Sequence, residues 1–252
     1  MLSAAEIANL HYQLNERWHS ATAGADEPAA DDWLALVAAH HRANFELWHI
    51  EDKARTPGAT DAELADVKRR VDTTNQRRND LAENLDRTLL GWLAQIAKRS
   101  AEVSEEHTSG AKALSNGPVS SARLKSCPDT KQTPDNSFGE PIFAGPLPNP
   151  TAPLHSESPG LIIDRLSILA LKIYHTREEA QREGAPEGHA QRNRERLGIL
   201  EEQRADLTHC LDALWRETLA GTRRFKLYRQ LKMYNDPSLN PAIYRKLGKE
   251  PG

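Results

Sequence analysis

The segment 159–175 constrains the fold most, because its apolar residues occur on every side of a helical wheel. Ser158 is a favourable N-cap, and the proline after it suits the first helical position. A helix that is apolar all round is usually buried all round. The segment also carries Asp164, Arg165 and Lys172, and a buried charge without a partner is strongly destabilising. We therefore expect these three side chains to pair with charges from other helices.

Apolar residues recur at three- and four-residue spacing in the other long segments of the chain, and this spacing is typical of amphipathic helices. The pattern predicts helices over residues 3–20, 32–55, 60–98, 158–182 and 189–219. A shorter helix is expected over 222–234, followed by turns rich in Asn, Asp and Pro. The predicted fold is all-α: two long antiparallel helical hairpins form a four-helix-bundle-like core, with an N-terminal helix and a basic C-terminal helix and turn extension.

The stretch 100–154 differs from its surroundings because it is rich in Ser, Thr, Pro, Gly and Lys and lacks periodicity. Such a composition is typical of a disordered linker. We divide the chain into residues 1–99 with the first hairpin, the linker, and residues 155–252 with the second hairpin and the C-terminal extension. Both hairpins are expected to form one folded domain. Whether the linker docks on the bundle or binds a partner stays open, given Phe138, Ile142 and Phe143 near its end.

The third and fifth predicted helices contain similar stretches, 78–86 and 204–212. In each stretch an arginine on the apolar stripe is followed by aspartate two residues later and by leucine three and seven residues later. We infer an internal duplication of helical hairpins. The alternative is coincidence, because helices with heptad-like patterns resemble one another by chance.

The two arginines of these stretches lead to a hypothesis about the interior. In an antiparallel hairpin, residues equally far from the turn lie level with each other. We therefore expect Arg204 to pair with Asp164. By the same argument, Arg78 should face His41 and Asn44.

Polar and charged side chains occupy several stripe positions at which leucine would be more stabilising. They form either a structural network that fixes helix register or a binding site, because perturbed charges cluster at functional positions. The basic and aromatic residues of 223–234 suit a phosphate-bearing ligand, unless the aromatic residues only dock a helix whose cations are solvated. The candidate ligand-binding residues are His41, Asn44, Trp48, Asp52, Arg78, Asp164, Arg165, Lys172, Arg204, Arg229 and Lys232.

Metal and nucleophile patterns are weaker in this sequence. Glu46 and His49 have the Glu-x-x-His spacing of a di-iron bundle helix, but no second copy of the motif occurs. Zinc usually needs three or four converging groups, so we expect no metal site. Ser167 has no histidine at helical spacing, and Cys210 points away from the adjacent His209. The sequence identifies no catalytic residue and no cofactor, and leaves open whether the chain is an enzyme.

Charge and cysteine content restrict the setting of the protein. A formal net charge of −3 argues against nucleic-acid binding by the whole chain. The two cysteines, Cys127 and Cys210, are far apart and favour a reducing compartment. Neither a signal peptide nor a run of about 18 apolar residues is evident. We expect a cytoplasmic protein without a membrane span.

Four blocks of the sequence, 44–55, 75–79, 156–175 and 228–237, resemble the domain-of-unknown-function family 4254. The most specific matches are Trp-His-Ile-Glu-Asp-Lys, which begins at residue 48, and Asp-Arg-Leu-Ser-Ile, which begins at residue 164. The resemblance does not extend to the linker. Members of the family tend to be bacterial and to be encoded near glycosyltransferase and surface-polysaccharide genes. The resemblance implies that setting, but brings no established activity and no accepted catalytic residues.

These observations lead to two functional hypotheses. The first is a cytoplasmic protein of bacterial glycan assembly that binds an anionic, phosphate-bearing ligand of the nucleotide or nucleotide-sugar type in a polar bundle core. The second is a non-catalytic helical adaptor or homodimer that recruits a glycosyltransferase. A concave pocket lined by several of the candidate cations would support the first. A closed, fully paired core with an exposed apolar helix face would support the second.

Overall fold

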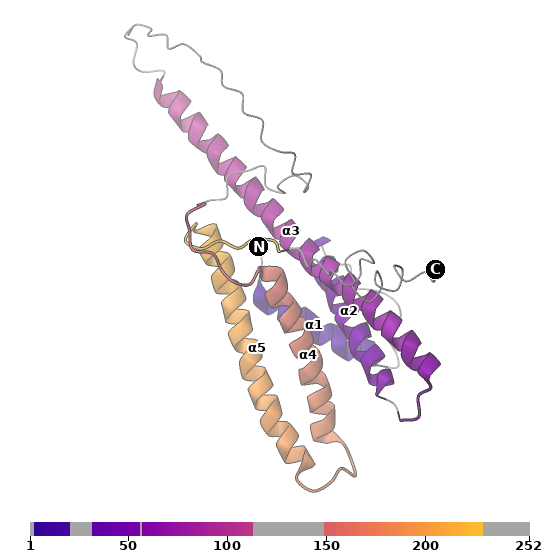
Figure 1. Ribbon diagram of the computed structural model, residues 1–252. Coiled ribbons are helices and arrows are strands. Elements are labelled where there is room, and N and C mark those ends of the chain that lie inside the picture. The colour runs from indigo at the N-terminus through magenta and orange to yellow at the C-terminus, as the bar shows by residue number, and fades with distance from the viewer. Residues whose placement is uncertain (1–2, 21–31, 56, 113–148, 229–252) are drawn as a thin grey trace, which may run out of the picture.

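The computed structural model of the chain shows an all-α architecture, as predicted (Figure 1). It describes residues 3–20, 32–55, 57–112 and 149–228. Within these ranges the helices are α1 (Ala4–His19), α2 (Asp32–Ala54), α3 (Asp61–Lys112), α4 (Pro159–Gln181) and α5 (His189–Leu219). The β-structure of the described residues is limited to one isolated bridge between Leu154 and Arg224. None of the described helices combines the length and the apolar character needed to cross a membrane.

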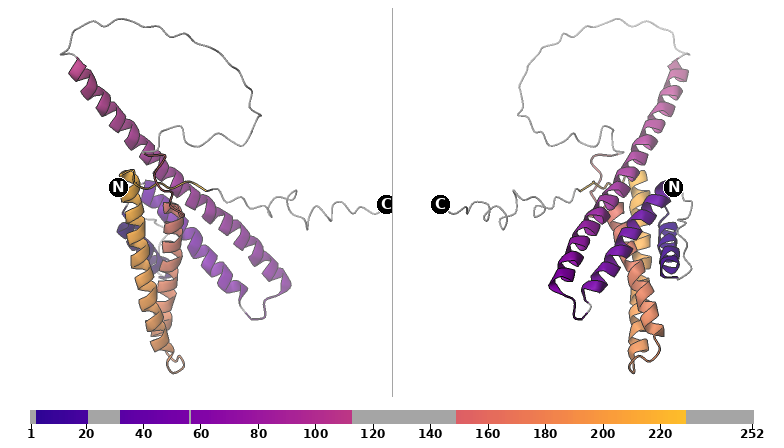
Figure 2. Two further views of the ribbon diagram at one scale, coloured as in Figure 1. Left: turned by 60° about the vertical axis from the view of Figure 1, so that its left-hand side comes forward. Right: turned by 90° about the vertical axis from the view of Figure 1, so that its right-hand side faces the viewer.

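Two antiparallel hairpins form the body of the molecule, one from α2 and α3 and the other from α4 and α5. Figure 2 shows that the hairpins lie against each other near one end and diverge toward their turns. α1 packs against α4 and also touches α2 and α5, while α3 crosses the start of α4. The C-terminal part of α3 extends beyond the other helices (Figures 1 and 2). α4 is therefore the helix that all the others contact.

The hydrophobic core lies where the two hairpins meet, and α4 contributes most to it because apolar residues occur on several of its sides. Burying each Leu or Ile side chain there contributes about 1.5–3 kcal/mol. α4 is not covered all round, however, because Lys172 and Arg165 are exposed. Members of the core that are 2 % exposed or less include Leu85, Leu89, Ile162, Ile163, Leu166, Leu211, Leu214 and Phe225.

The helix starts follow from local sequence. The Leu161 N–H donates to the Ser158 hydroxyl at 3.4 Å, which confirms Ser158 as the N-cap of α4. At the start of α3, Thr60 and Glu63 form a capping box: the Glu63 carboxylate accepts from the Thr60 N–H at 2.8 Å, and the Thr60 hydroxyl accepts from the Glu63 N–H at 3.3 Å. These hydrogen bonds satisfy backbone donors that the first turn of a helix leaves without an intrahelical acceptor.

The chain differs from the sequence-based prediction at two helix ends. α3 reaches Lys112 and so includes the first residues of the predicted linker. The predicted helix over 222–234 is wrong for its described part, because residues 222–228 are not helical. α5 ends at Leu219, Gly221 shortly after it has a left-handed φ of +70°, and the chain then pairs with the segment before α4. There the Arg224 N–H donates to the Pro153 carbonyl and the His155 N–H donates to the Arg224 carbonyl.

The crossing of α3 and α4 depends on a residue without a side chain. The Gly160 N–H donates to Asp86 Oδ1 at 2.6 Å, which brings the two backbones close together. A Cβ atom at Gly160 would lie 2.5 Å from the Ala82 carbonyl oxygen and 2.9 Å from the Asp86 carboxylate. Glycine is therefore required at this position by space and not by backbone angles.

Replacing Gly160 by alanine should lower the free energy of unfolding by about 1–3 kcal/mol, because α3 and α4 must move apart. The matched control is Gly198→Ala on α5, where an added Cβ meets no atom within 4 Å. That control should be neutral or stabilising by up to about 1 kcal/mol, because alanine favours helix. Urea unfolding followed by circular dichroism measures both variants. A Gly160→Ala protein as stable as the control would contradict this account of the crossing.

Candidate functional site

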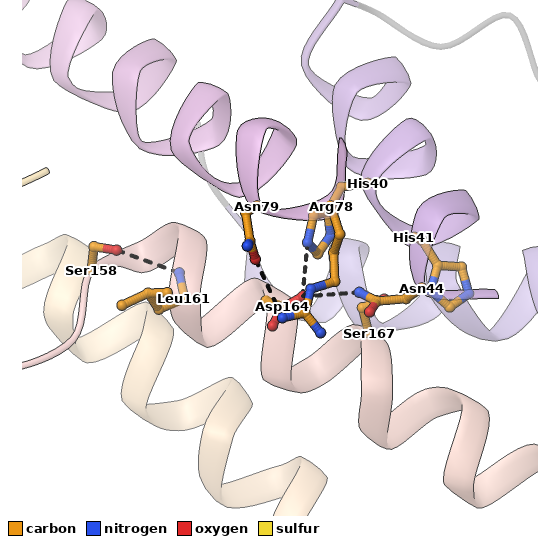
Figure 3. Close-up of polar contacts among 9 residues, drawn as sticks. All are labelled: His40, His41, Asn44, Arg78, Asn79, Ser158, Leu161, Asp164 and Ser167. Carbon is orange, nitrogen blue, oxygen red and sulfur yellow. Dashed lines mark hydrogen bonds and ion pairs between the residues drawn. The ribbon is translucent and has the colours of Figure 1, made fainter. Parts of the chain in front are cut away.

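The interior contains a polar network centred on Asp164 of α4 (Figure 3). Asp164 Oδ1 accepts hydrogen bonds from His40 Nε2 and from Asn44 Nδ2 of α2, each at 3.0 Å. The Arg78 guanidinium of α3 lies on the same oxygen, with its Nε at 3.7 Å. The Asp164 side chain is only 14 % exposed, so this carboxylate joins three helices out of contact with most solvent.

A chain of hydrogen bonds continues the network from α2 to α1. Asn44 Nδ2 also donates to Ser167 Oγ at 2.9 Å, and Ser167 Oγ lies 2.8 Å from His41 Nδ1. His41 Nε2 lies 2.9 Å from Asn15 Oδ1. An amide oxygen can only accept, so His41 Nε2 carries the ring hydrogen and Nδ1 accepts from the Ser167 hydroxyl. The hydrogen bonds are therefore all donated in one direction, from Asn44 to Ser167, from Ser167 to His41 and from His41 to Asn15.

Burial determines the charge states in this network. Desolvation lowers the pKa of His41 to about 3, and it lowers the pKa of the neighbouring His11 well below the usual histidine value. Burial alone would raise the pKa of Asp164. The hydrogen bond from His40 and the nearby Arg78 guanidinium outweigh that effect and hold this pKa below its usual value. At neutral pH the network therefore contains a carboxylate and a guanidinium beside the neutral imidazoles of His41 and His11.

Two features make this network structural in character. Ser167 and His41 are fully buried, so no substrate reaches the contact between hydroxyl and imidazole. The network also links α1, α2, α3 and α4, which fixes the register of the two hairpins against each other. Not every polar atom beside the network is paired. His11 stacks on His41 at 4.4 Å between ring centroids, and both His11 ring nitrogens lack a hydrogen-bond partner in the described part of the chain.

The structure brings together four of the residues that were selected from sequence, namely His41, Asn44, Arg78 and Asp164. Arg78 and Asn44 meet at the same carboxylate oxygen, close to the predicted arrangement. The other candidates lie elsewhere or outside the described residues: Trp48, Asp52, Arg165, Lys172 and Arg204 are on other parts of the surface or its margin, and Arg229 and Lys232 fall outside the described ranges.

The expectation that Arg165 and Lys172 pair with charges from other helices is wrong. Arg165 is 53 % exposed and donates to Glu157, in the segment just before its own helix, at 2.9 Å. Lys172 is exposed and has no ion pair among the described residues. Asp52 is also exposed and pairs with Arg55, the residue that follows its own helix. The long stems of basic side chains let an amphipathic helix place their charges in water, even next to apolar neighbours.

The predicted pair of Arg204 with Asp164 does not form. The hairpin argument correctly placed this part of α5 beside the Asp164 region of α4. Gln203 and Leu207 of α5 line a groove of about 380 Å³ together with Ile168 of α4. Arg204, however, follows Gln203 by about 100° around the helix and so belongs to another face. That face borders α1.

Arg204 lines an open groove of about 770 Å³ between α1 and α5. Arg177 of α4 reaches the same groove, where its guanidinium lies 5.3 Å from the Tyr12 ring centroid and 3.2 Å from a Glu16 oxygen. No carboxylate of the described residues lies within ion-pair distance of Arg204. The groove is lined by Ala5, Ala8, Asn9, Tyr12, Arg177, Arg204, Ala205, Thr208, His209 and Asp212.

The two similar stretches, 78–86 of α3 and 204–212 of α5, make similar contacts through their last aspartate and different contacts through their arginine. Asp86 of α3 accepts from the Gly160 N–H at the start of α4, and Asp212 of α5 accepts from the Ala4 N–H at the start of α1 at 3.0 Å. Both aspartates thus bind a helix N-terminus, where a negative charge is favourable. Their arginine counterparts differ, because Arg78 lies at the buried Asp164 and Arg204 lies in the open groove.

Sequence reasoning missed several members of the network. His11 and Asn15 lie four residues apart, on the side of α1 that packs against the bundle, and that spacing was a signal for both. Ser167 was rejected as a nucleophile because helical spacing only finds partners on the same helix. His40 was not selected, because its partner Asp164 lies on another helix. All four are 1 % exposed or less.

One family profile matches the chain. Its description is "Protein of unknown function (DUF4254)", and it covers residues 34–112 and 129–227. The matched ranges include nearly all of α2 and the whole of α3, α4 and α5. They also contain the central residues of the network, which are His40, His41, Asn44, Arg78, Asp164 and Ser167. No curated protein and no solved structure matches the chain.

Proposed function

Since the chain belongs to the family described as a protein of unknown function (DUF4254), we propose a function from its own geometry. The protein binds an anionic, phosphate-bearing small molecule in the groove between α1 and α5, and not in the interior of the bundle. The interior polar residues bind mainly to one another, and Ser167, His40 and His41 are fully buried, out of reach of a ligand. The groove, by contrast, is open and contains two guanidinium groups.

The observation that carries this proposal is the position of Arg204. Its side chain lines the groove without a carboxylate partner among the described residues. Arginine binds phosphate through charge-assisted and often bidentate hydrogen bonds, each worth about 1.5–3 kcal/mol. Arg177 and His209 add further N–H groups around the same volume, while the Thr208 hydroxyl already donates to the Arg204 carbonyl. Asp212 is the one carboxylate among the described residues that line the groove, and its Oδ1 accepts from the Ala4 N–H.

The size of the groove and its aromatic wall favour a nucleotide over free phosphate. A volume of about 770 Å³ lies in the range of small-molecule sites. Tyr12 is 40 % exposed, and its ring offers a stacking surface for a base. The family resemblance implies a setting of bacterial glycan assembly, in which nucleotide-sugars and sugar phosphates are the anionic metabolites. We therefore place the ligand in the nucleotide or nucleotide-sugar class.

The adaptor hypothesis is less well supported by the surface of the described residues. An adaptor needs a continuous apolar face, and large exposed patches mark such sites. The large exposed hydrophobic side chains are instead spread over α1, α3, α5 and the segments beside them: Tyr12, Leu64, Ile96, Leu154, Ile199 and Tyr228. They form no stripe along a single helix.

Isothermal titration of the full chain with UDP, UDP-glucose and inorganic phosphate tests the proposal. The wild type should bind UDP, and Arg204→Gln should weaken that binding about 10- to 100-fold through loss of a charge-assisted hydrogen bond. Arg194→Gln is the matched control, because Arg194 is an exposed arginine of the same helix whose partner is the side chain of Gln191. The control should bind within about twofold of wild type.

Two results would count against this function. One is the absence of binding by all three probes to a wild-type protein with full helical content. The other is equal weakening in Arg204→Gln and Arg194→Gln, which would show a general effect of charge and not a site.

A further inference from the structure

Three histidines from three different helices converge at the end of α1. They are His19 of α1, His49 of α2 and His175 of α4. One potential ligand atom from each of them lies within 4.8 Å of the others. The ring centroid of His19 lies 5.1 Å from that of His49 and 5.0 Å from that of His175. This cluster lies outside the Asp164 network and outside the groove of Arg204.

One nitrogen of each ring is already held in place. His19 Nδ1 lies 2.8 Å from the Asn15 carbonyl oxygen, and His49 Nδ1 lies 2.8 Å from the Phe45 carbonyl oxygen. A carbonyl only accepts, so both Nδ1 atoms carry the hydrogen and both Nε2 atoms present a lone pair. His175 Nδ1 is similarly placed, 2.9 Å from a Glu178 carboxylate oxygen. Metal-binding histidines show this arrangement, in which the nitrogen that does not bind the metal donates to a carbonyl or carboxylate.

Two of the three remaining nitrogens have no hydrogen-bond partner in the described part of the chain. His19 Nε2 and His175 Nε2 are buried and lack a hydrogen-bond partner. Leaving a buried polar atom unpaired is unfavourable, so two such atoms in one cluster call for an explanation. A ligand that accepts lone pairs from all three rings satisfies them together.

We propose that His19, His49 and His175 bind one divalent metal ion of the zinc type, with a water molecule or an exogenous oxygen ligand in the remaining position. Three neutral imidazoles with an open fourth position are a known zinc arrangement. Zinc–nitrogen bonds of about 2.0–2.1 Å place tetrahedral ligand atoms roughly 3.3 Å apart. The three rings reach that spacing by small side-chain rotations, since their ligand atoms start within 4.8 Å.

The surroundings favour a preorganised site. The Tyr174 ring stacks on His19 at 4.0 Å between centroids, and the Trp48 ring stacks on His175 at 5.0 Å with an interplanar angle of 9°. These contacts restrict the orientation of the imidazoles. Trp48, selected from sequence as a ligand-binding residue, therefore supports this cluster instead of the interior network.

The test uses the full chain, freed of metal with EDTA, dialysed and titrated with Zn²⁺ in competition with a chromophoric chelator. We expect one tightly bound ion per chain. His49→Gln and His175→Gln should each weaken Zn²⁺ binding by at least about 100-fold, and Glu178→Gln by about 10-fold, as for a residue that orients a ligand. His209→Gln on α5 is the matched control and should bind Zn²⁺ within about twofold of wild type.

Co²⁺ substitution gives a second readout on the wild-type protein. Tetrahedral Co²⁺ with nitrogen and oxygen ligands should show intense visible absorption without a thiolate-to-cobalt band. Zn²⁺ should also protect His19, His49 and His175 from modification by diethyl pyrocarbonate, as mapped by mass spectrometry, so the proposal is testable even if a variant does not fold. Absence of a stoichiometric ion, unchanged affinity in folded His49→Gln, or a thiolate band would overturn the site.

Discussion

Replacing Asp164 by alanine is expected to lower the free energy of unfolding by about 3–5 kcal/mol, the cost of removing one partner from a buried charge pair. His40 Nε2 and Asn44 Nδ2 would lose their shared acceptor, and Arg78 would lose its nearest carboxylate. All three donors lie in the interior or at its margin, so water does not replace the carboxylate at low cost. Urea unfolding followed by circular dichroism measures the loss.

Two further variants sharpen this prediction. Asp164→Asn keeps an acceptor oxygen for His40 but removes the charge opposite Arg78, so its loss should be smaller than that of alanine. Asp66→Ala removes an aspartate whose side chain is 58 % exposed in an ion pair with Arg69, and it should change stability by less than about 0.5 kcal/mol. If Asp164→Ala behaved like Asp66→Ala, the network would not hold the hairpins together.

Asp86 should make stability depend on pH between about 4 and 7. Burial raises the pKa of Asp86 from 3.8 to about 6, although the hydrogen bonds from Ser158 and Gly160 partly oppose the shift. A carboxyl whose pKa is raised on folding binds protons more tightly in the folded state. Its stabilising contribution is therefore complete below pH 3.8 and is lost as the pH rises through about 6. A pKa shift of this size changes the free energy of unfolding by about 3 kcal/mol between the two pH limits.

Comparison of wild type with Asp86→Asn isolates this contribution. Asparagine keeps an acceptor for the Gly160 N–H but does not titrate. The stability of wild type relative to Asp86→Asn should fall by up to about 3 kcal/mol between pH 4 and pH 7. Asp164 has the opposite sign, because its pKa is lowered on folding and its contribution is lost only as the pH falls below 3.8. Since both proteins contain Asp164, its effect cancels, and parallel pH curves would contradict the role of Asp86.

The helices and their starts were predictable because they depend on neighbours in the sequence. Ser158 caps α4 as expected, and α5 has the predicted bounds His189–Leu219. Capping and periodicity are properties of a few consecutive turns, and they carry over directly to the structure. The end of α3 was missed because the chain beyond Arg99 is rich in polar residues, and apolar spacing gives no signal where apolar residues are few.

The interior was only partly predictable because it depends on which helix faces which. The sequence indicates that Asp164 is buried, but not that its partners come from α2 and α3 instead of α5. Hairpin register placed Arg204 at the correct level and on the wrong face, since a step of one residue turns the side chain by about 100°. The histidine cluster was missed for the same reason: His19, His49 and His175 are distant in sequence and meet only through the packing of α1 on α2 and α4.

The hydrogen bond from the Ala4 N–H to Asp212 spans 208 residues of sequence, and this has a consequence for how the protein assembles during synthesis. Each hairpin closes over a short turn, so its loop-closure entropy is small and it can form while the chain is still emerging from the ribosome. α1 emerges before either hairpin, but its hydrogen bond to Asp212 forms only after α5 has been synthesised. We therefore expect α1, which is synthesised before both hairpins, to dock after them, and its apolar face to stay accessible to chaperones until then.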